Sequence, residues 1–201
     1  MFGIRALVLF GASSLIALAA PAQQQDVLNP KDTSALHPPP GAKVAIVEFA
    51  DMECPMCAMD NLVIQQAVDK YHVAWERHDY PLPQHNWSFQ AAVNARWFDT
   101  KSKDLGNEYR NAVFANQASI ETKSDLQDFT AKFAQQHGTA LPFVMDAQGK
   151  LTAEVKADAA LADRMGIHET PTAWVVTTHG YMQIRDFRNL YSMLDQAVAG
   201  K

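Results

Sequence analysis

Cys54 and Cys57 are the only two cysteines of the chain, and two residues separate them. They follow the largely apolar stretch 44–49 and precede an apolar run with helical spacing, so the first sulfur is expected at a helix N-terminus. Free backbone N–H groups and the positive end of the helix dipole stabilise a thiolate there. The pair can close an internal disulfide and exchange it with another protein through a mixed disulfide. The spacing therefore predicts a redox site.

A structural staple is the alternative interpretation of the same pair, since exported proteins keep disulfides. A disulfide stabilises a fold mainly by closing a long loop, and the loop between Cys54 and Cys57 is very short. A stapling pair would more usefully join distant segments. The catalytic interpretation is therefore favoured.

Copper binding is a further alternative, from a different functional class. Met52 precedes the pair at a spacing that could place three soft sulfur ligands, Met52, Cys54 and Cys57, around Cu(I). Against a copper carrier, Pro55 stiffens the loop, and methionines more often serve as adaptable apolar contacts. We therefore expect no metal site, and no cofactor beyond the redox-active disulfide Cys54–Cys57.

The N-terminus predicts export. Arg5 precedes the apolar stretch 6–20, and Ala20-Pro21-Ala22 has the small residues of a cleavage site, so residues 1–22 are predicted to be a signal peptide. A polar, proline-rich linker follows over 23–42. Removal of the signal peptide changes the formal net charge from −5 to −6, which argues against nucleic acid as a partner. The expected location is periplasmic or otherwise extracytoplasmic.

The remaining chain, residues 43–200, is expected to form one α/β domain. Its hydrophobic patterns predict the following elements. The strands are 43–49, 72–78, 172–178 and 181–187, and the helices are 58–70, 88–98, 105–116, 124–136, 151–165 and 190–198. Ser124 and Gln127 fit a capping box for the fourth helix. Strand-led units with a final hairpin imply a mixed central sheet, beside which a helical subdomain is inserted at about 85–140.

These features together resemble a thioredoxin-fold protein of the DsbA-like disulfide oxidoreductase group. The resemblance rests on the strand 44–49, on Cys54-Pro55-Met56-Cys57 with its helix, on the helical insertion, and on Glu169-Thr170-Pro171-Thr172 before a hairpin. It covers about 43–199. A CxxC after a strand, with Thr-Pro-Thr far downstream, is a specific combination.

The resemblance implies roles for three further residues, and a fourth, Met56, is expected to serve as an adaptable apolar contact. Pro171 matches a proline that is cis and lies beside the sulfurs, and Thr170 would present backbone groups to an extended substrate. Met56 would line the substrate groove. Glu48 matches a buried acid that would relay the proton of Cys57, although a polar strand residue there could equally point outward.

Three other acids near the pair, Asp51, Glu53 and Asp60, are expected to form a solvated acidic rim. Negative charge near Cys54 would oppose its thiolate. The middle dipeptide Pro55-Met56 contains no histidine that could lower the Cys54 pKa, so the helix N-terminus must do so.

The predicted function is that of an extracytoplasmic thiol:disulfide oxidoreductase, a dithiol oxidase that introduces disulfides into exported proteins. Its partners would be unfolded or partly oxidised exported proteins and a membrane quinone-linked enzyme that reoxidises the pair. A disulfide reductase or isomerase on the same fold is the nearest alternative. The dipeptide Pro55-Met56 and the threonine before Pro171 leave the direction of exchange open.

Overall fold

The computed structural model describes residues 30–200 of the chain. The predicted signal peptide, residues 1–22, and the first part of the predicted linker, residues 23–29, lie outside the described residues. Within residues 30–200, no helix combines the length and the apolar character needed to cross a bilayer.

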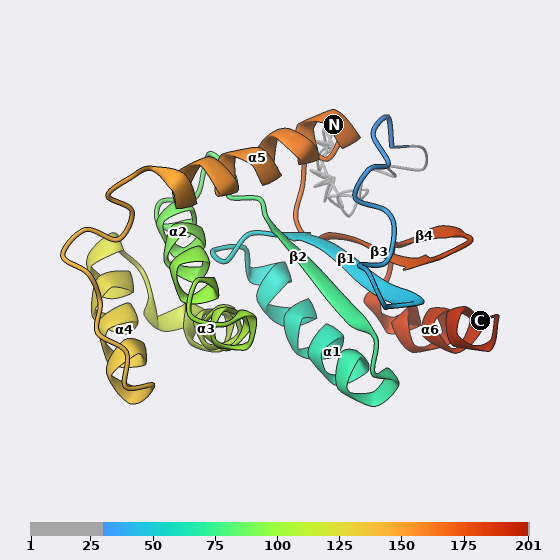
Figure 1. The fold of residues 1–201 in the computed structure, drawn as a ribbon, viewed down its shortest axis with the longest axis horizontal. Helices are drawn as coiled ribbons and strands as arrows, with labels where there is room; N and C mark the ends of the chain where they lie inside the picture. Colours follow the sequence, from blue (N-terminus) through green and yellow to red (C-terminus); the bar gives the residue numbers. More distant parts are fainter. Residues whose placement is uncertain (1–29, 201) are drawn as a thin grey trace, which may run out of the picture.

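A four-stranded mixed sheet forms the centre of the structure (Figure 1). Its strands are β1 (Val44–Ala50), β2 (Ala74–Asp79), β3 (Thr172–Thr177) and β4 (Gly180–Ile184), in the order β2-β1-β3-β4. Strand β1 pairs with β2 in parallel and with β3 antiparallel, and β3 pairs with β4 antiparallel. The predicted mixed sheet and its final hairpin are confirmed. The last strand ends earlier than predicted, and a 3-10 turn, Phe187–Asn189, follows it.

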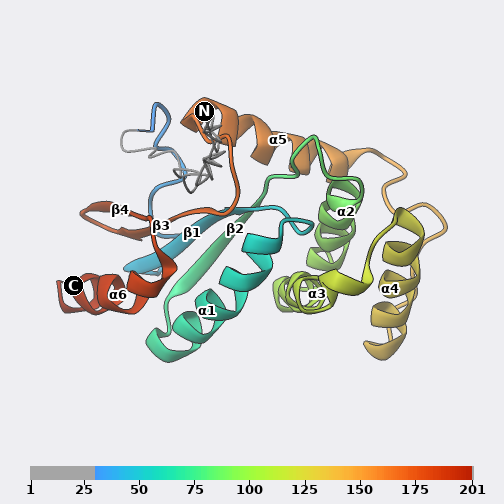
Figure 2. The same ribbon diagram turned by 180° about the vertical axis from the view of Figure 1, so that it is seen from behind.

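Helices cover both faces of the sheet, because alternate residues of β1 point to opposite sides. Ile46 belongs to a buried cluster with residues of α1 (Pro55–Tyr71) and α6 (Leu190–Ala199), whereas Val47 packs with residues of α5 (Lys150–Met165). Figures 1 and 2 show α1 and α6 along one face and α5 across the other. Burial on both faces explains why β1 is almost continuously apolar in sequence.

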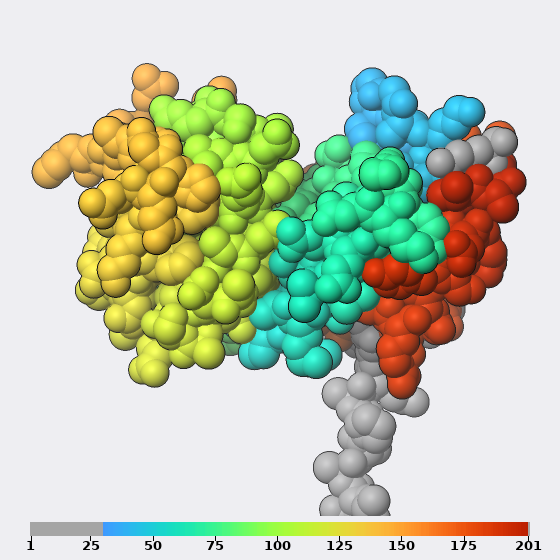
Figure 3. All heavy atoms as spheres, turned by 90° about the horizontal axis from the view of Figure 1, so that it is seen from below, coloured from blue at the N-terminus to red at the C-terminus, as the bar shows by residue number. Residues whose placement is uncertain are grey.

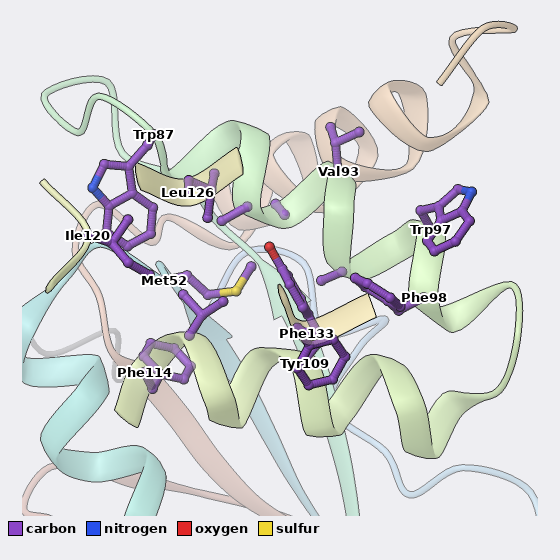
Figure 4. Packing of buried hydrophobic residues seen from close by; sticks show 14 of the residues in the cluster. Met52, Trp87, Val93, Trp97, Phe98, Tyr109, Phe114, Ile120, Leu126 and Phe133 are labelled. Carbon is purple, nitrogen blue, oxygen red and sulfur yellow. The ribbon is translucent and has the colours of Figure 1, made fainter. Parts of the chain in front are cut away.

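Three helices stand beside the sheet, between β2 and α5 in the chain. They are α2 (Ser88–Asp99), α3 (Lys103–Asn116) and α4 (Lys123–Gln136), and a 3-10 turn, Gln117–Ser119, follows α3. Figure 3 shows them gathered on one side of the molecule, with α1 and α6 on the other. Their shared core consists of large buried side chains that converge from all three helices (Figure 4). They include Trp87, Phe98, Tyr109, Leu126 and Phe133.

The N-termini of two of these helices are capped by hydroxyl side chains. The Ser102 hydroxyl accepts a hydrogen bond from the backbone of Leu105 at the start of α3. At the start of α4, Thr122 and Asp125 form the capping box, so the predicted box of Ser124 and Gln127 is wrong. The motif has the same spacing but begins two residues earlier, where Thr122 has the extended backbone that an N-cap requires.

A buried network of charges joins the helical insertion to the sheet. Asp79 at the end of β2 accepts hydrogen bonds from Arg96 of α2 at 2.6 Å and from Arg110 of α3 at 3.1 Å. Arg110 also bonds Asp99 of α2, and Arg96 also bonds Asp158 of α5. Because each of these ions has a partner of opposite charge, the network fixes how α2, α3 and α5 meet the sheet edge.

We expect Gly106→Ala to destabilise the fold by about 1–3 kcal/mol, the usual cost of overpacking a filled site. A methyl group at Gly106 would lie 1.8 Å from Asp99 Oδ1 and 3.0 Å from the Asp99 backbone nitrogen. The Asp99 carboxylate cannot move freely, because it is bonded to Arg110 at 3.0 Å and 2.9 Å. The free energy of unfolding in urea measures the loss.

Gly200→Ala is the matched control for this substitution. Its added methyl group would contact only the Gln196 carbonyl oxygen, at 3.6 Å, so the free energy of unfolding should change by less than about 0.5 kcal/mol. Equal stability of the two variants would show that the close approach of α2 and α3 does not depend on Gly106.

Candidate active site

Cys54 and Cys57 lie at the junction between β1 and α1. Cys54 is the N-cap of α1, its own side chain makes no capping bond, and Pro55 occupies the first turn. No acidic residue lies in that first turn, so the sulfur of Cys54 is the anionic group available to the helix N-terminus. Cys54 is 7% exposed, whereas Cys57 is fully buried. A partner can therefore reach Cys54 more easily than Cys57.

The two thiols have pKa values displaced in opposite directions. The pKa of Cys54 is lowered to about 6, chiefly because the Cys57 thiol donates a hydrogen bond to its sulfur, and the backbone N–H groups of Cys57 and Met56 add to this against the effect of burial. The pKa of Cys57 is raised well above its usual range, first by burial and then by the charges of Cys54 and Glu48. At neutral pH the site therefore holds one thiolate, on Cys54, and one thiol, on Cys57.

The loop before β3 brings the predicted proline to this site. The Thr170–Pro171 peptide bond is cis, as the family resemblance implied. The Cys54 sulfur lies 3.3 Å from the Thr170 carbonyl oxygen, to which it donates a hydrogen bond when protonated, and this contact joins segments 116 positions apart in the chain. Thr170 and Pro171 thus lie directly against the nucleophilic sulfur, in agreement with the predicted placement of both residues.

Glu48 lies inside the protein, on the face of β1 that α1 covers. Its side chain is fully buried, and the Trp75 indole Nε1 donates to its Oε2 at 3.0 Å. Burial raises the pKa of Glu48 to about 7, although the Arg77 charge and the Trp75 hydrogen bond oppose the shift. The sequence allowed Glu48 to point either inward or outward, and in the structure it points inward. A carboxyl group with this pKa can hold or release a proton near neutral pH.

Arg77 is a part of this site that sequence reasoning missed. It lies opposite Glu48 in the parallel pairing of β1 and β2. Its guanidinium donates to Asn61 at 2.7 Å and to Asn111 at 2.9 Å, and it stacks over the Trp75 ring. The sequence signal was that Arg77 lies two residues after Trp75 on the predicted strand, so that both side chains share one face. This signal points to the site only once the pairing of Arg77 with Glu48 is known.

The prediction of a solvated acidic rim is wrong for two of its three members, Asp51 and Glu53. Asp51 is buried, and its carboxylate accepts hydrogen bonds from the backbone N–H groups of Glu53 and Leu82 and contacts His85 at 2.7 Å. The Glu53 carboxylate accepts from the backbone N–H groups of Trp87 and Ser88, at the N-terminus of α2. Both acids point inward because loop and helix-terminal N–H groups need acceptors.

Asp60 is the acid of this group that faces the substrate side. Together with Met56, Thr170, Pro171 and Phe187, it lines an open groove of about 570 Å³. Burial raises the pKa of Asp60 to about 6, and the charges of Cys54 and Asp186 raise it further. Met56 is 53% exposed, which agrees with the predicted place of this side chain in a groove beside the sulfurs.

Met52 packs as a core residue. It is buried among Trp87, Phe114, Ile120 and Leu126 of the helical insertion (Figure 4). Within residues 30–200, no group of three or more His, Cys, Asp or Glu side chains is placed to hold a metal ion.

A family model described as thioredoxin matches residues 38–195, which include both cysteines, Glu48 and Pro171. The chain belongs to the thioredoxin family. No curated protein matches it in sequence.

Several solved structures have a fold similar to that of this chain. The chain is similar to alpha-DsbA1 of Wolbachia pipientis, with a TM-score of 0.62 and 19% identity over 83% of this chain and 93% of that one. It is also similar to DsbA2 of Pseudomonas aeruginosa, with a TM-score of 0.59 and 20% identity over 81% and 92%. The third example is ScsC of Proteus mirabilis, with a TM-score of 0.64 and 14% identity over 82% and 72%. The fold is therefore the DsbA-like thioredoxin fold, as predicted.

The buried acid of this thioredoxin-family site generates a pH-dependent prediction. Because folding raises the pKa of Glu48 from 4.5 to about 7, the folded chain binds an extra proton between these pH values, and stability from this group falls as the pH rises from about 4.5 to 7. Glu48→Gln should remove this fall. Each pKa unit corresponds to about 1.4 kcal/mol, so a shift from 4.5 to about 7 should make reduced Glu48→Gln more stable than reduced wild type at pH 8, by about 3–4 kcal/mol.

Urea unfolding at pH 5 and pH 8, with both proteins reduced, provides the measurement. The comparison of the two proteins at the same pH removes most of the contribution of the cysteines. An unchanged difference between the proteins at the two pH values would contradict a raised pKa for Glu48.

Asp60→Asn should lower the pKa of Cys54 by a fraction of a unit. The charges of Asp60 and Cys54 repel each other, so a neutral residue at position 60 leaves the thiolate easier to form. The ultraviolet absorbance of the thiolate, followed against pH, gives the pKa.

Asp69→Asn is the matched control, because Asp69 is an exposed acid further along the same helix. Its effect on the Cys54 pKa should be negligible. Equal shifts in the two variants would mean that only the net charge of α1 matters, and not the place of Asp60 in the groove.

Proposed function

We propose that this chain is an extracytoplasmic thiol:disulfide oxidoreductase that works as a dithiol oxidase on exported proteins. The observation that carries the proposal is the division of roles within one dithiol. Cys54 combines a pKa of about 6 with contact to the groove residue Thr170, and Cys57 is buried with a raised pKa. An oxidase needs this division, because a stabilised Cys54 thiolate favours the reduced form of the protein.

The proposed reaction begins from the Cys54–Cys57 disulfide. A substrate thiolate attacks the sulfur of Cys54, a substrate–Cys54 disulfide forms, and Cys57 leaves with the electron pair and takes up a proton. Glu48 lies close enough for its charge to affect Cys57, and its pKa of about 7 suits it to supply that proton. The protonated Cys57 then cannot attack the mixed disulfide, which directs the next step to the substrate.

In the second step a second substrate thiolate attacks the substrate sulfur of the mixed disulfide. A substrate disulfide forms, and Cys54 leaves as a thiolate. Two electrons have passed from the substrate dithiol to the protein. The substrate loses two protons, one of which remains on Cys57, and the other enters solution because Cys54 is ionised at neutral pH.

The groove supports an extended, unfolded substrate. Thr170, Pro171 and Met56 all line it, and the exposed Met56 offers an adaptable apolar surface. Exported proteins that are unfolded or partly oxidised present such segments. The regenerating partner that we propose is a membrane quinone-linked enzyme that presents a disulfide. The Cys54 thiolate would attack this disulfide, and Cys57, after losing its proton, would then attack the Cys54 sulfur, so that the Cys54–Cys57 disulfide forms again and the partner leaves as a dithiol.

An extracytoplasmic location is part of the proposal. The signal-peptide pattern of residues 1–22 supports it, and so does the fold shared with a protein from Salmonella enterica that is described as a periplasmic thioredoxin-like protein, at 17% identity and a TM-score of 0.63. An oxidising compartment would let the disulfide persist between turnovers.

The reduction potential of the Cys54–Cys57 pair tests the direction of exchange. We expect a value between about −120 and −180 mV in equilibrium with glutathione, because the Cys54 thiolate stabilises the reduced form. A value near about −270 mV would overturn the oxidase assignment in favour of a reductase.

Trapping with a peptide that carries a single thiol tests the assignment of roles within the pair. In Cys57→Ser, Cys54 is first converted to a mixed disulfide with glutathione. The peptide thiolate should then displace glutathione and give a lasting peptide–Cys54 disulfide that mass spectrometry detects, because neither the peptide nor the protein has a second thiol to release it. Cys54→Ser is the control and should give little product, since Cys57 is buried.

A further inference from the structure

The active-site loop, Asp51–Cys54, is held by the helical insertion. The Met52 side chain lies in the core of the insertion, and the Glu53 carboxylate bonds the N-terminus of α2. A third contact comes from Gln117, at the end of α3, and it is made to the backbone of the loop itself. The mechanism above does not use this contact.

The side-chain amide of Gln117 contacts two backbone carbonyl groups of the active-site loop. Its Nε2 donates to the Met52 carbonyl oxygen at 2.9 Å and to the Cys54 carbonyl oxygen at 3.0 Å. A side-chain amide has two N–H donors, so this contact uses both of them. It spans 65 and 63 positions of the chain, and the side chain is half-buried where it does so.

The two carbonyl groups flank the nucleophile. Cys54 is the N-cap of α1, and its carbonyl oxygen also accepts the first bond of that helix, from the Ala58 N–H at 3.2 Å. The direction of this carbonyl is coupled to the backbone angles of Cys54, which in turn direct its side chain. A donor on the carbonyls at both Met52 and Cys54 therefore fixes the loop on either side of Glu53 and sets where the sulfur points.

Electrostatics add to this geometric effect. A carbonyl oxygen carries partial negative charge, and such charge close to a thiolate raises the pKa of the thiol. An N–H donor offsets part of that charge at each oxygen. Gln117 thus favours the thiolate without touching its sulfur.

We propose that Gln117 is a positioning residue for the redox reaction, through which the helical insertion holds Cys54 in the N-cap geometry that makes its sulfur the nucleophile. The inference rests on the proposed function for its meaning in catalysis. The claim that the insertion affects the position and the pKa of Cys54 does not depend on the direction of exchange.

Gln117→Met tests the proposal, because methionine has a similar length and no N–H donor. We expect the pKa of Cys54 to rise by about one unit, and the equilibrium constant for oxidation of glutathione by the protein to fall about tenfold, since one pKa unit is a factor of ten between the protonation states. Gln117→Glu should act in the same direction and more strongly, because a carboxylate adds negative charge beside both carbonyl groups.

Gln135→Met on α4 is the matched control, because Gln135 is exposed. Gln135→Met should leave the ionisation constant of Cys54 and the equilibrium constant with glutathione within twofold of wild type. All measurements use the full chain, which is kept reduced for the pKa titration and is equilibrated with glutathione for the equilibrium constant. Unfolding in urea establishes that each variant is folded. If Gln117→Met loosens the fold, Gln117→Asn keeps the amide but shortens its reach, and it should give the same rise in pKa.

Two outcomes are distinguished. The positioning role would be overturned if folded Gln117 variants kept both the ionisation constant of Cys54 and the equilibrium constant with glutathione within twofold of wild type. This holds whatever the wild-type potential is. A wild-type potential in the reductase range, with the pKa still raised in Gln117→Met, would overturn the proposed direction of exchange and leave the positioning role in place.

Discussion

The structure depends on one constraint, which is that a thiolate must be stabilised at the start of α1 while a second sulfur beside it stays neutral. The backbone N–H groups of the first helical turn and the Cys57 thiol satisfy the first requirement, and burial of Cys57 satisfies the second. Both follow from placing the pair between a fully buried strand and the helix that covers it. Thr170 and Pro171 complete this arrangement, because the Thr170 carbonyl oxygen, in the cis peptide that they share, lies against the Cys54 sulfur.

Charges around the sulfurs follow from the same constraint. A fully ionised Glu48 and Asp60 would oppose the thiolate, but burial raises their pKa values to about 7 and about 6, close to the value for Cys54. The three groups therefore titrate over one pH range and influence one another. When Cys54 enters a disulfide its charge disappears, and each acid becomes easier to ionise. The proton content of the site thus changes with its redox state.

The sequence was sufficient for the local chemistry and insufficient for the long-range contacts. The pair Cys54 and Cys57, the strand before it and the helix after it are adjacent in the chain, so their relation could be predicted. The direction of Glu48 could not, because a strand buried on both faces has no polar side to indicate which residues point inward.

The inward-pointing acids show the same limit. The Asp51 carboxylate bonds Leu82, 31 positions away, and the Glu53 carboxylate bonds Trp87, 34 positions away. In the sequence alone, no hydrogen-bond donor for these carboxylates is evident near the CxxC motif, so the sequence predicts a solvated rim for this acidic loop. Only the position of α2 reveals that these carboxylates satisfy N–H groups at the entrance to the insertion.

These contacts make the helical insertion a part of the redox site. The buried cluster that contains Cys54 and Cys57 is the same cluster that contains the cores of α2, α3 and α4. Asp79, Arg96 and Arg110 tie α2 and α3 to the sheet through ions that would be costly to leave unpaired. A displacement of the insertion would therefore disturb both these ion pairs and the backbone that carries Cys54. The stability of the insertion and the reactivity of the thiolate are then linked properties of one structure.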